Sequence, residues 1–158
     1  SYQKNPEMFN EIAKKFPEIK FVWVGTGDLK NKLTSNNIEV TGWKNRDELM
    51  EILNKSDIFI LPSLWEGLPI SLLEAMALKK PCIVSNVIGN RDVISNGNNG
   101  FVCNNLNEFV TLIKEIQEDK YDLVQISQNA FNDIKNTYNT DVMCQKYCNI
   151  YKGEMNYG

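Results

Sequence analysis

Short apolar segments alternate with amphipathic segments along this chain. Runs rich in β-branched and aromatic residues predict buried strands over residues 19–24, 38–41, 57–61, 82–85 and 101–103. Apolar residues that recur every three or four positions predict helices over residues 6–16, 28–37, 46–54, 69–80, 106–117 and 121–138. We further expect a loop with a short helix at 86–95, a turn cluster at 96–100, a last helix from 140 to about 152, and a frayed end at 153–158.

Strands that alternate with helices through short connections indicate a parallel sheet covered on both faces. We therefore predict a single α/β domain over residues 1–158, with a Rossmann-like doubly wound parallel sheet and a helical C-terminal tail. Ligands bind such sheets at the carboxyl ends of the strands. Since Gly25, Gly42, Trp65 and Glu66 each follow a predicted strand, we expect them to meet at one edge of the sheet.

The stretch 65–77 follows the apolar strand 57–61 and enters a helix. Gly67 permits backbone angles that are closed to other residues, and Pro69 suits the first helical position, where a missing N–H costs nothing. The first free donors of that helix are then the N–H groups of Ile70, Ser71 and Leu72. A helix N-terminus with free donors attracts anions, phosphate above all.

Two carboxylates flank this helix start, Glu66 in the loop before it and Glu74 more than a turn inside it. They would repel a bare phosphate, but a carboxylate accepts hydrogen bonds from sugar hydroxyls. A sugar attached to a nucleoside diphosphate meets both conditions. The plainer interpretation is an ordinary strand–turn–helix corner whose carboxylates face solvent.

The pattern Glu66, seven intervening residues and Glu74, with Gly-Leu-Pro after the first Glu, resembles the signature of the family-four retaining glycosyltransferases. The resemblance implies the GT-B fold, with this chain as the C-terminal, donor-binding half of a two-domain enzyme. By position, Glu66 is the candidate catalytic residue and holds the donor sugar together with Gly67 and Leu68. Ile70 to Leu72 would face the diphosphate, Glu74 would hold the ribose hydroxyls, and Pro69 counts among the donor-binding residues.

The N-terminal residues extend the resemblance. Lys4 matches the Lys of the family's Arg-Leu-x-x-x-Lys segment, whose two cations neutralise the donor diphosphate. The partner Arg would lie one residue before Ser1, as would the strand that carries it, which is usually central in a doubly wound sheet. We therefore expect that strand to be missing from this sequence. A solvated terminal lysine is an equal alternative for Lys4.

Two glycine-containing turns follow strands, Gly25-Thr26-Gly27 and Gly42-Trp43-Lys44. The first is a weak sign of a phosphate loop, because Lys30 occupies the place of the third glycine of a dinucleotide fingerprint. It is either a turn that lets a ligand approach closely or a plain turn. The second matches the family loop whose backbone reads the nucleotide base, and Trp43 either stacks on that base or packs in the core.

Gly89-Asn90-Arg91-Asp92 stands where the family usually has Gly-Gly-x-x-Glu. Such variants look like those of bacterial surface-polysaccharide enzymes, as in capsule or lipopolysaccharide synthesis. Arg91 either meets a phosphate or a sugar carboxylate, or forms a surface ion pair with Asp92.

The composition of the chain limits the partners and the catalytic groups that we expect. The chain has 158 residues, a net charge of -3 with interspersed signs, and no apolar run of membrane-spanning length, so we expect no nucleic-acid partner and no membrane segment. The absence of histidine removes the commonest general base and metal ligand. Cys82 and Cys103 fit apolar strands, whereas Cys144 and Cys148 share a helix face and are at most half a metal site. We expect no metal and no cofactor, and reduced thiols in the cytoplasm.

The implied reaction is transfer of a sugar from a nucleoside diphosphate to an acceptor hydroxyl with retention of the anomeric configuration. Lys4 and the helix donors would stabilise the charge that develops on the leaving diphosphate, which itself takes the acceptor proton. Because the family's acceptor site lies in the N-terminal half, this chain alone should bind donor weakly and transfer little. Two alternatives remain, a sugar-nucleotide epimerase of the same fold and a non-catalytic sugar-nucleotide-binding module.

Overall fold

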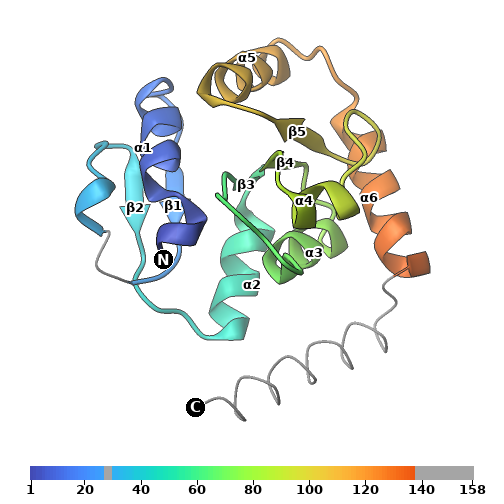
Figure 1. Cartoon of the computed structure of the whole chain (residues 1–158), viewed down its shortest axis with the longest axis horizontal. Coiled ribbons are helices and arrows are strands. Elements are labelled where there is room, and N and C mark those ends of the chain that lie inside the picture. The colour runs from blue at the N-terminus through green and yellow to red at the C-terminus, as the bar shows by residue number, and fades with distance from the viewer. Residues whose placement is uncertain (27–29, 138–158) are drawn as a thin grey trace.

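The structure, a computed structural model, describes residues 1–26 and 30–137. The predicted helix from residue 140, the frayed end, Gly27, Cys144 and Cys148 lie outside the described residues. The elements, shown in Figure 1, are η1 (Tyr2–Lys4), α1 (Pro6–Lys14), β1 (Phe21–Trp23), η2 (Lys30–Lys32), β2 (Ile38–Val40), α2 (Arg46–Lys55), β3 (Phe59–Leu61), α3 (Ile70–Ala77), β4 (Cys82–Ser85), α4 (Ile88–Val93), β5 (Phe101–Cys103), α5 (Leu106–Gln117) and α6 (Leu123–Thr137).

All described strand pairs are parallel, which confirms the predicted α/β class. β1 pairs with β2, and β3, β4 and β5 follow one another in a second sheet. The single sheet that we predicted is thus present as two hydrogen-bonded sheets, because β1 and β3 are not paired with each other.

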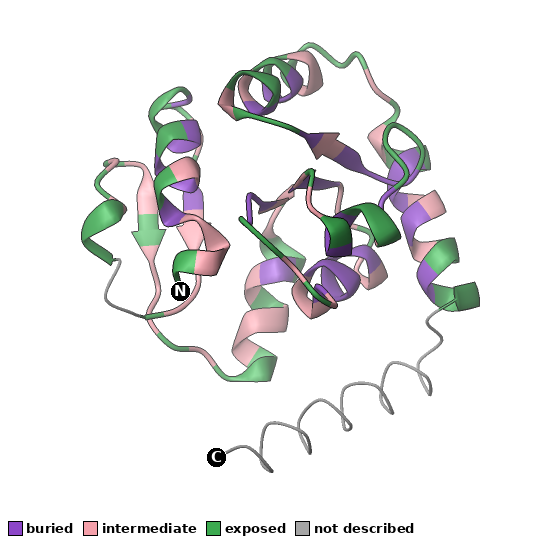
Figure 2. Ribbon diagram, viewed as in Figure 1, coloured by how far each residue is buried: buried purple, intermediate pink, exposed green. Residues whose placement is uncertain are grey.

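Side chains of β4 separate two apolar cores. Ile83 belongs to a core with α1 and α5, whereas Cys82 and Val84 belong to a core with α2, α3 and α6. Successive strand residues point to opposite faces, so helices cover both faces of this sheet. These three of the four β4 side chains are fully buried, as Figure 2 shows for the centre of the molecule.

The predicted helix 28–37 is wrong over its described part. Residues 30–32 form one 3₁₀ turn, and residues 33–35 have no regular structure. The buried Asn10 of α1 accepts hydrogen bonds from the N–H groups of Thr34 and Ser35, at 2.8 and 2.9 Å. Asn37 donates to three carbonyl groups at and after the end of α1. These side-chain bonds hold the segment as a loop, because they compete with helical main-chain bonding.

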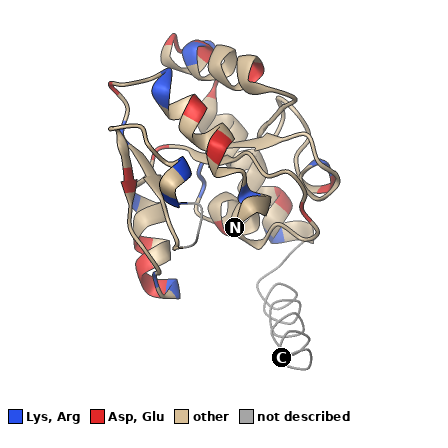
Figure 3. Cartoon of the chain, turned by 60° about the vertical axis from the view of Figure 1, so that its left-hand side comes forward, with Lys and Arg blue, Asp and Glu red and all other residues tan. Residues whose placement is uncertain are grey.

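Charged residues of both signs are interspersed over the helices in Figure 3. Within the part of the chain that the structure describes, no helix is both long and apolar enough to cross a membrane.

Candidate functional site

The loop after β3 packs against the first residues of the chain. The N–H of Leu64 donates to the carbonyl of Gln3 at 2.8 Å, and the Gln3 side chain donates to the carbonyl of Trp65 at 2.9 Å. Lys4 Nζ and Ser63 Oγ both donate to Glu66 Oε1, at 2.5 and 2.6 Å. The structure therefore brings together the two residues that the sequence assigned to the diphosphate and to the sugar.

The environments of Lys4 and Glu66 differ. The Glu66 side chain is 4% exposed and the Lys4 side chain 36%. Lys4 is therefore a paired cation rather than a freely solvated terminal lysine. Among the described residues, Glu66 Oε2 has a single long contact, to Gln3 Nε2 at 3.5 Å, so this oxygen retains capacity to accept further hydrogen bonds.

A chain of hydrogen-bonded polar groups, buried at Ser63 and Asn90 and half-buried at Ser85, supports the Glu66 loop. Ser85 Oγ donates to the carbonyl of Ser63 at 2.5 Å, and Asn90 Nδ2 donates to the carbonyl of Ser85 at 3.0 Å. Asn90 is fully buried, and its Oδ1 has no hydrogen-bond partner among the described residues. Sequence reasoning missed Ser63 and Ser85; a serine within two positions of the last apolar residue of each run, Leu61 and Val84, is the signal that marks them.

The start of α3 differs from the prediction in two ways. Pro69 is the N-cap, with a φ of -80° and a ψ of 81°, not the first helical residue. The N–H groups of Ile70 and Leu72 are not free, because they donate to the carbonyls of Leu68 and Pro69, each at 3.0 Å. Of the three predicted donors, only the N–H of Ser71 has no acceptor among the described residues.

Gly67 is not needed for its backbone angles. Its φ does not lie in the left-handed region, and a Cβ at this position would meet nothing within 4 Å. The glycine that the packing requires is Gly89. A Cβ there would lie 2.3 Å from the carbonyl oxygen of Gly67 and 2.5 Å from that of Glu66.

Glu74 is buried in α3 at 5% exposure. Burial raises the pKa of its carboxyl above the ordinary value, and the Arg46 guanidinium at the start of α2 opposes that effect. Neither carboxylate of the motif therefore faces solvent as the plainer interpretation required. Arg46, whose charge acts on Glu74, comes two residues after Lys44 in the chain.

The turns after β1 and β2 lie side by side. Gly25 and Gly42 form an isolated bridge in which the N–H of Gly25 donates to the carbonyl of Gly42 at 3.0 Å. Both have positive φ, 130° and 78°, which favours glycine. Trp43 is 75% exposed, so it does not pack in the core, and Lys44 pairs with Glu48 at 3.6 Å.

Ser1 connects these turns to the Glu66 loop. It lines a small pocket with Trp23 and Gly25, while Lys4, three residues on, binds Glu66. Gly25 and Gly42 therefore meet as expected, whereas their meeting with Trp65 and Glu66 stays a prediction. The structure describes no direct contact between Trp43 and Glu66. A separate cavity of about 440 Å³ lies between β5 and α5, away from the predicted site residues.

The family model described as "Glycosyl transferases group 1" matches residues 1–133. The chain belongs to this family. It is 37% identical over 166 aligned residues to "UDP-Gal:alpha-D-GlcNAc-diphosphoundecaprenol alpha-1,3-galactosyltransferase" of Escherichia coli, covering 94% of this chain and 42% of that protein. It is 33% identical over 108 residues to "N,N'-diacetylbacillosaminyl-diphospho-undecaprenol alpha-1,3-N-acetylgalactosaminyltransferase" of Campylobacter jejuni, covering 67% and 28% of the two chains.

Solved structures share the fold. Anabaena Alr3699/HepE in complex with UDP and glucose superposes with a TM-score of 0.78 at 17% identity, over 97% of this chain and 46% of that one. TarM superposes with a TM-score of 0.75 at 22% identity, over 96% and 33%. This glycosyltransferase chain therefore spans less than half the length of these relatives, and the family and fold implied by the Glu66–Glu74 motif are confirmed.

The last segment that the sequence analysis compared with the family is Gly89-Asn90-Arg91-Asp92, which follows β4. Arg91 and Asp92 of α4 are both exposed, and no ion pair joins them among the described residues. The cysteines of the sheet, Cys82 and Cys103, are buried free thiols. Burial raises the pKa of the Cys103 thiol to about 12 and that of Cys82 further.

Proposed function

We propose that this chain binds a nucleoside-diphosphate sugar as the donor half of a retaining glycosyltransferase that transfers the sugar to an acceptor hydroxyl. The observation that supports it most is the meeting of Lys4 and Glu66, 62 residues apart in sequence, at the carboxyl end of β3 in a chain of this family. That edge is where ligands bind parallel sheets.

Lys4 and Glu66 have complementary roles in this proposal. The Lys4 ammonium turns from Glu66 to the donor diphosphate and stabilises the charge that develops on the leaving group. Glu66, the candidate catalytic residue, then accepts hydrogen bonds from hydroxyls of the donor sugar, first through Oε2. The Ser71 N–H donates to the diphosphate, while the polar chain through Ser63 and Ser85 keeps the carboxylate in place.

The nucleoside would lie between α3 and the turns of β1 and β2. Glu74 accepts hydrogen bonds from the ribose hydroxyls, and the exposed Trp43 stacks on the base beside the Gly42 and Lys44 main chain. Gly25, with Gly27 after it, allows the ligand to approach the backbone closely. We propose uridine diphosphate as the nucleotide, since the HepE structure holds UDP and the E. coli relative is named for UDP-Gal.

We assign the acceptor-binding site to a part of the enzyme outside this chain, since the chain covers 42% of the E. coli relative. Both relatives quoted above are named for diphosphoundecaprenol-linked sugars. We therefore assign the acceptor to the class of polyprenyl-diphosphate-linked sugars used in bacterial surface polysaccharide synthesis. We further propose that the enzyme acts at the cytoplasmic face of the membrane and that transfer requires no metal.

Titration of UDP into the chain, followed by protein NMR because binding is expected to be weak, tests donor binding. We expect shifts at Glu66 to Glu74 in the native chain. We expect at least tenfold weaker binding after Glu74→Ala, because the ribose loses hydrogen bonds to a charged acceptor. Glu51→Ala on the exposed face of α2 is the matched control and should bind as the native chain does. Equal affinity of all three proteins would remove the ribose assignment.

Transfer itself separates an enzyme from a non-catalytic binding module. Full-length protein should move the sugar from its UDP donor to a polyprenyl-diphosphate-linked acceptor, and NMR of the product should show the anomeric configuration of the donor. Donor binding without transfer in the full-length protein would favour the module. An inverted product would exclude a retaining mechanism.

A further inference from the structure

Exposed apolar side chains gather around the Glu66 loop. The described residues include six exposed large hydrophobic side chains, and four of them are Tyr2, Leu64, Trp65 and Ile88. Leu64 and Trp65 belong to the loop itself, and the ring of Tyr2 contacts that of Trp65, with 6.0 Å between the ring centroids. Single exposed apolar residues are common on protein surfaces, but a group of them beside a site marks a surface that binds something.

Helix α4 packs directly against the same loop. Its Gly89 lies so close to the carbonyl oxygens of Glu66 and Gly67 that no side chain would fit between them. Ile88 and Arg91 are three positions apart on this helix and are both exposed, so they share one of its faces. No salt bridge among the described residues includes Arg91. The loop and α4 therefore present apolar groups together with an unpaired cation.

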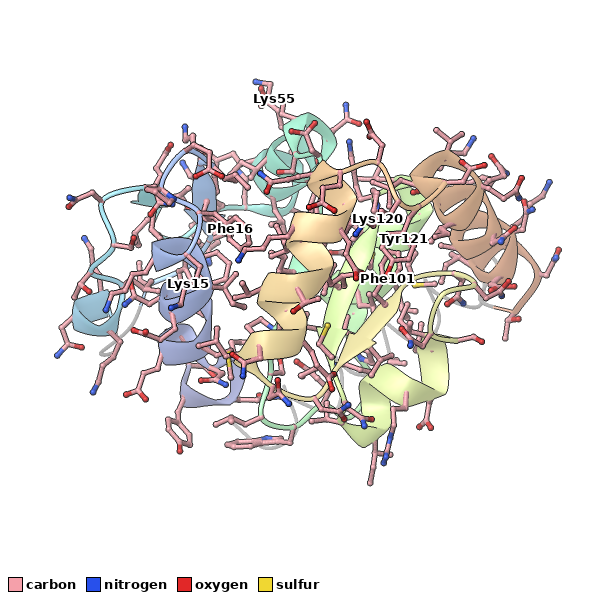
Figure 4. The ribbon with its side chains drawn as sticks, turned by 90° about the horizontal axis from the view of Figure 1, so that it is seen from above. Lys15, Phe16, Lys55, Phe101, Lys120 and Tyr121 are labelled. Carbon is pink, nitrogen blue, oxygen red and sulfur yellow. The ribbon has the colours of Figure 1, made fainter. Side chains whose placement is uncertain are left out.

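These exposed groups lie at the end of the strands where the donor site is proposed. Trp65 follows β3 and Ile88 follows β4, and these neighbouring strands are parallel, so both residues come after carboxyl ends. In Figure 4, the yellow-green helix α4 lies at the edge opposite Lys55, which ends α2 ahead of the amino end of β3. A molecule bound at the Glu66 site would therefore have these groups beside it.

Trp65 is held in place although its side chain is uncovered. Its carbonyl accepts a hydrogen bond from Gln3 Nε2 at 2.9 Å, and the N–H of Leu64 donates to the carbonyl of Gln3 at 2.8 Å. Trp65 is 53% exposed, whereas the side chain of Glu66, the next residue, is 4% exposed. An indole left in water on an ordered loop is apolar area that a ligand can bury at a gain. The loop thus directs a carboxylate into the protein and an aromatic ring toward solvent.

We propose that Trp65 and Tyr2 form a platform for the acceptor sugar, and that Arg91 binds the diphosphate attached to that sugar. The inference rests on the proposed function, because the acceptor hydroxyl must reach the donor sugar that Glu66 holds, and Trp65 is the adjacent residue. The apolar C–H face of a hexose ring packs on flat aromatic side chains, whose polar atoms stay free to hydrogen-bond. A guanidinium pairs with phosphate oxygens through two parallel hydrogen bonds. The rest of the acceptor site belongs to the part of the enzyme outside this chain.

Acceptor kinetics of the full-length enzyme test the platform. The probe is an N-acetylhexosamine joined through a diphosphate to a farnesyl chain. Trp65→Leu keeps an apolar side chain but removes the flat ring, so we expect KM for the acceptor to rise about tenfold, as the loss of one stacked ring does. KM for the donor should not change, and Trp65→Phe should recover part of the loss. Trp43→Leu is the matched tryptophan variant and should raise KM for the donor alone. Val124→Ala, at an exposed position on α6, should change neither.

Arg91 is tested with the same probe. Arg91→Gln should raise KM for the acceptor about tenfold, because a charge-assisted pair with the acceptor diphosphate is lost. UDP affinity should be unchanged, since Lys4 serves the donor diphosphate. Arg91→Lys keeps the charge and should recover part of the loss. Lys114→Gln, which removes an exposed cation from α5, is the matched charge control and should leave both KM values unchanged.

The outcomes separate this proposal from the donor assignment. An acceptor KM unchanged in Trp65→Leu, with UDP still bound, would remove the platform and keep the donor site. A Trp65→Leu effect that vanishes when an ethyl group replaces the farnesyl chain would mean that the indole contacts the lipid. A lower Tm with both KM values raised would mean that Trp65 packs against another part of the enzyme. Weaker UDP binding in Arg91→Gln would assign Arg91 to the donor. If the native full-length protein neither binds UDP nor transfers sugar, the proposed function fails and the platform with it.

Discussion

Glu74 shows what burial does to one carboxylate. Desolvation raises its pKa, so the folded chain holds the proton more tightly than the unfolded chain, whose ordinary value is 4.5. Between the two pKa values the folded state binds more protons, and the free energy of unfolding therefore falls as pH rises. The stabilising contribution of the protonated form is complete below the unfolded pKa and is lost as pH rises through the folded one.

Glu74→Gln removes this dependence, because its neutral amide has no charge to desolvate. We expect the variant to gain stability relative to the native chain between pH 4 and pH 7, while its affinity for UDP decreases through loss of the charged acceptor. Urea unfolding at the two pH values, with UDP titration at pH 7, measures both effects. A stability difference that is the same at both pH values would show that the Glu74 carboxyl does not titrate differently in the folded chain.

At the scale of elements, α4 fixes the loop that carries Glu66. Gly89 in its first turn contacts the main chain of Glu66 and Gly67 so closely that a methyl group cannot fit without a backbone shift. Gly89→Ala should therefore cost about 1–3 kcal/mol of stability, as overpacking does, and should weaken UDP binding by displacing Glu66. Gly67→Ala is the matched substitution, since nothing lies within 4 Å of its new Cβ, and it should leave the free energy of unfolding nearly unchanged. Thermal unfolding of the two variants measures the contrast, and equal losses would contradict the packing argument.

The observed helices and strands also show which structural features can be predicted from sequence patterns. Each predicted strand is present because a short apolar run bounded by turn residues leaves few alternatives. The helix predicted at 28–37 fails because Asn10, far away in sequence, takes the N–H groups that the helix needs. The prediction that the N–H groups of Ile70 and Leu72 are free is wrong for a local reason. Pro69 has a non-helical ψ, and the carbonyls of Leu68 and Pro69 accept hydrogen bonds from these two groups. Patterns predict where elements form, but these side-chain and terminal contacts depend on coordinates.

At the scale of the molecule, the Glu66–Glu74 motif was enough to predict the family and the end of the strand where the site lies. The hydrogen-bond partners of each site residue could be found only from the three-dimensional structure. Glu66 and Glu74 are eight positions apart, so a sequence pattern links them directly. Ser63 and Ser85 meet only because β3 and β4 are adjacent, and nothing local in either segment indicates that contact.

The Lys4–Glu66 ion pair links the start of the chain to the loop after β3. Variants of the two residues can distinguish its contribution to stability from its contribution to UDP binding. Lys4→Met leaves the Glu66 carboxylate buried without its cation, which should cost about 1–3 kcal/mol of stability and weaken UDP binding at least tenfold. In the double variant Lys4→Met, Glu66→Gln the buried charge is gone, so the stability loss should be largely recovered. UDP binding should stay weak, because the diphosphate still lacks its cation. Chemical unfolding and UDP titration of the native chain, both single variants and the double variant complete the cycle. Recovery of binding together with stability would mean that Lys4 serves only to neutralise Glu66, and its assignment to the diphosphate would be wrong.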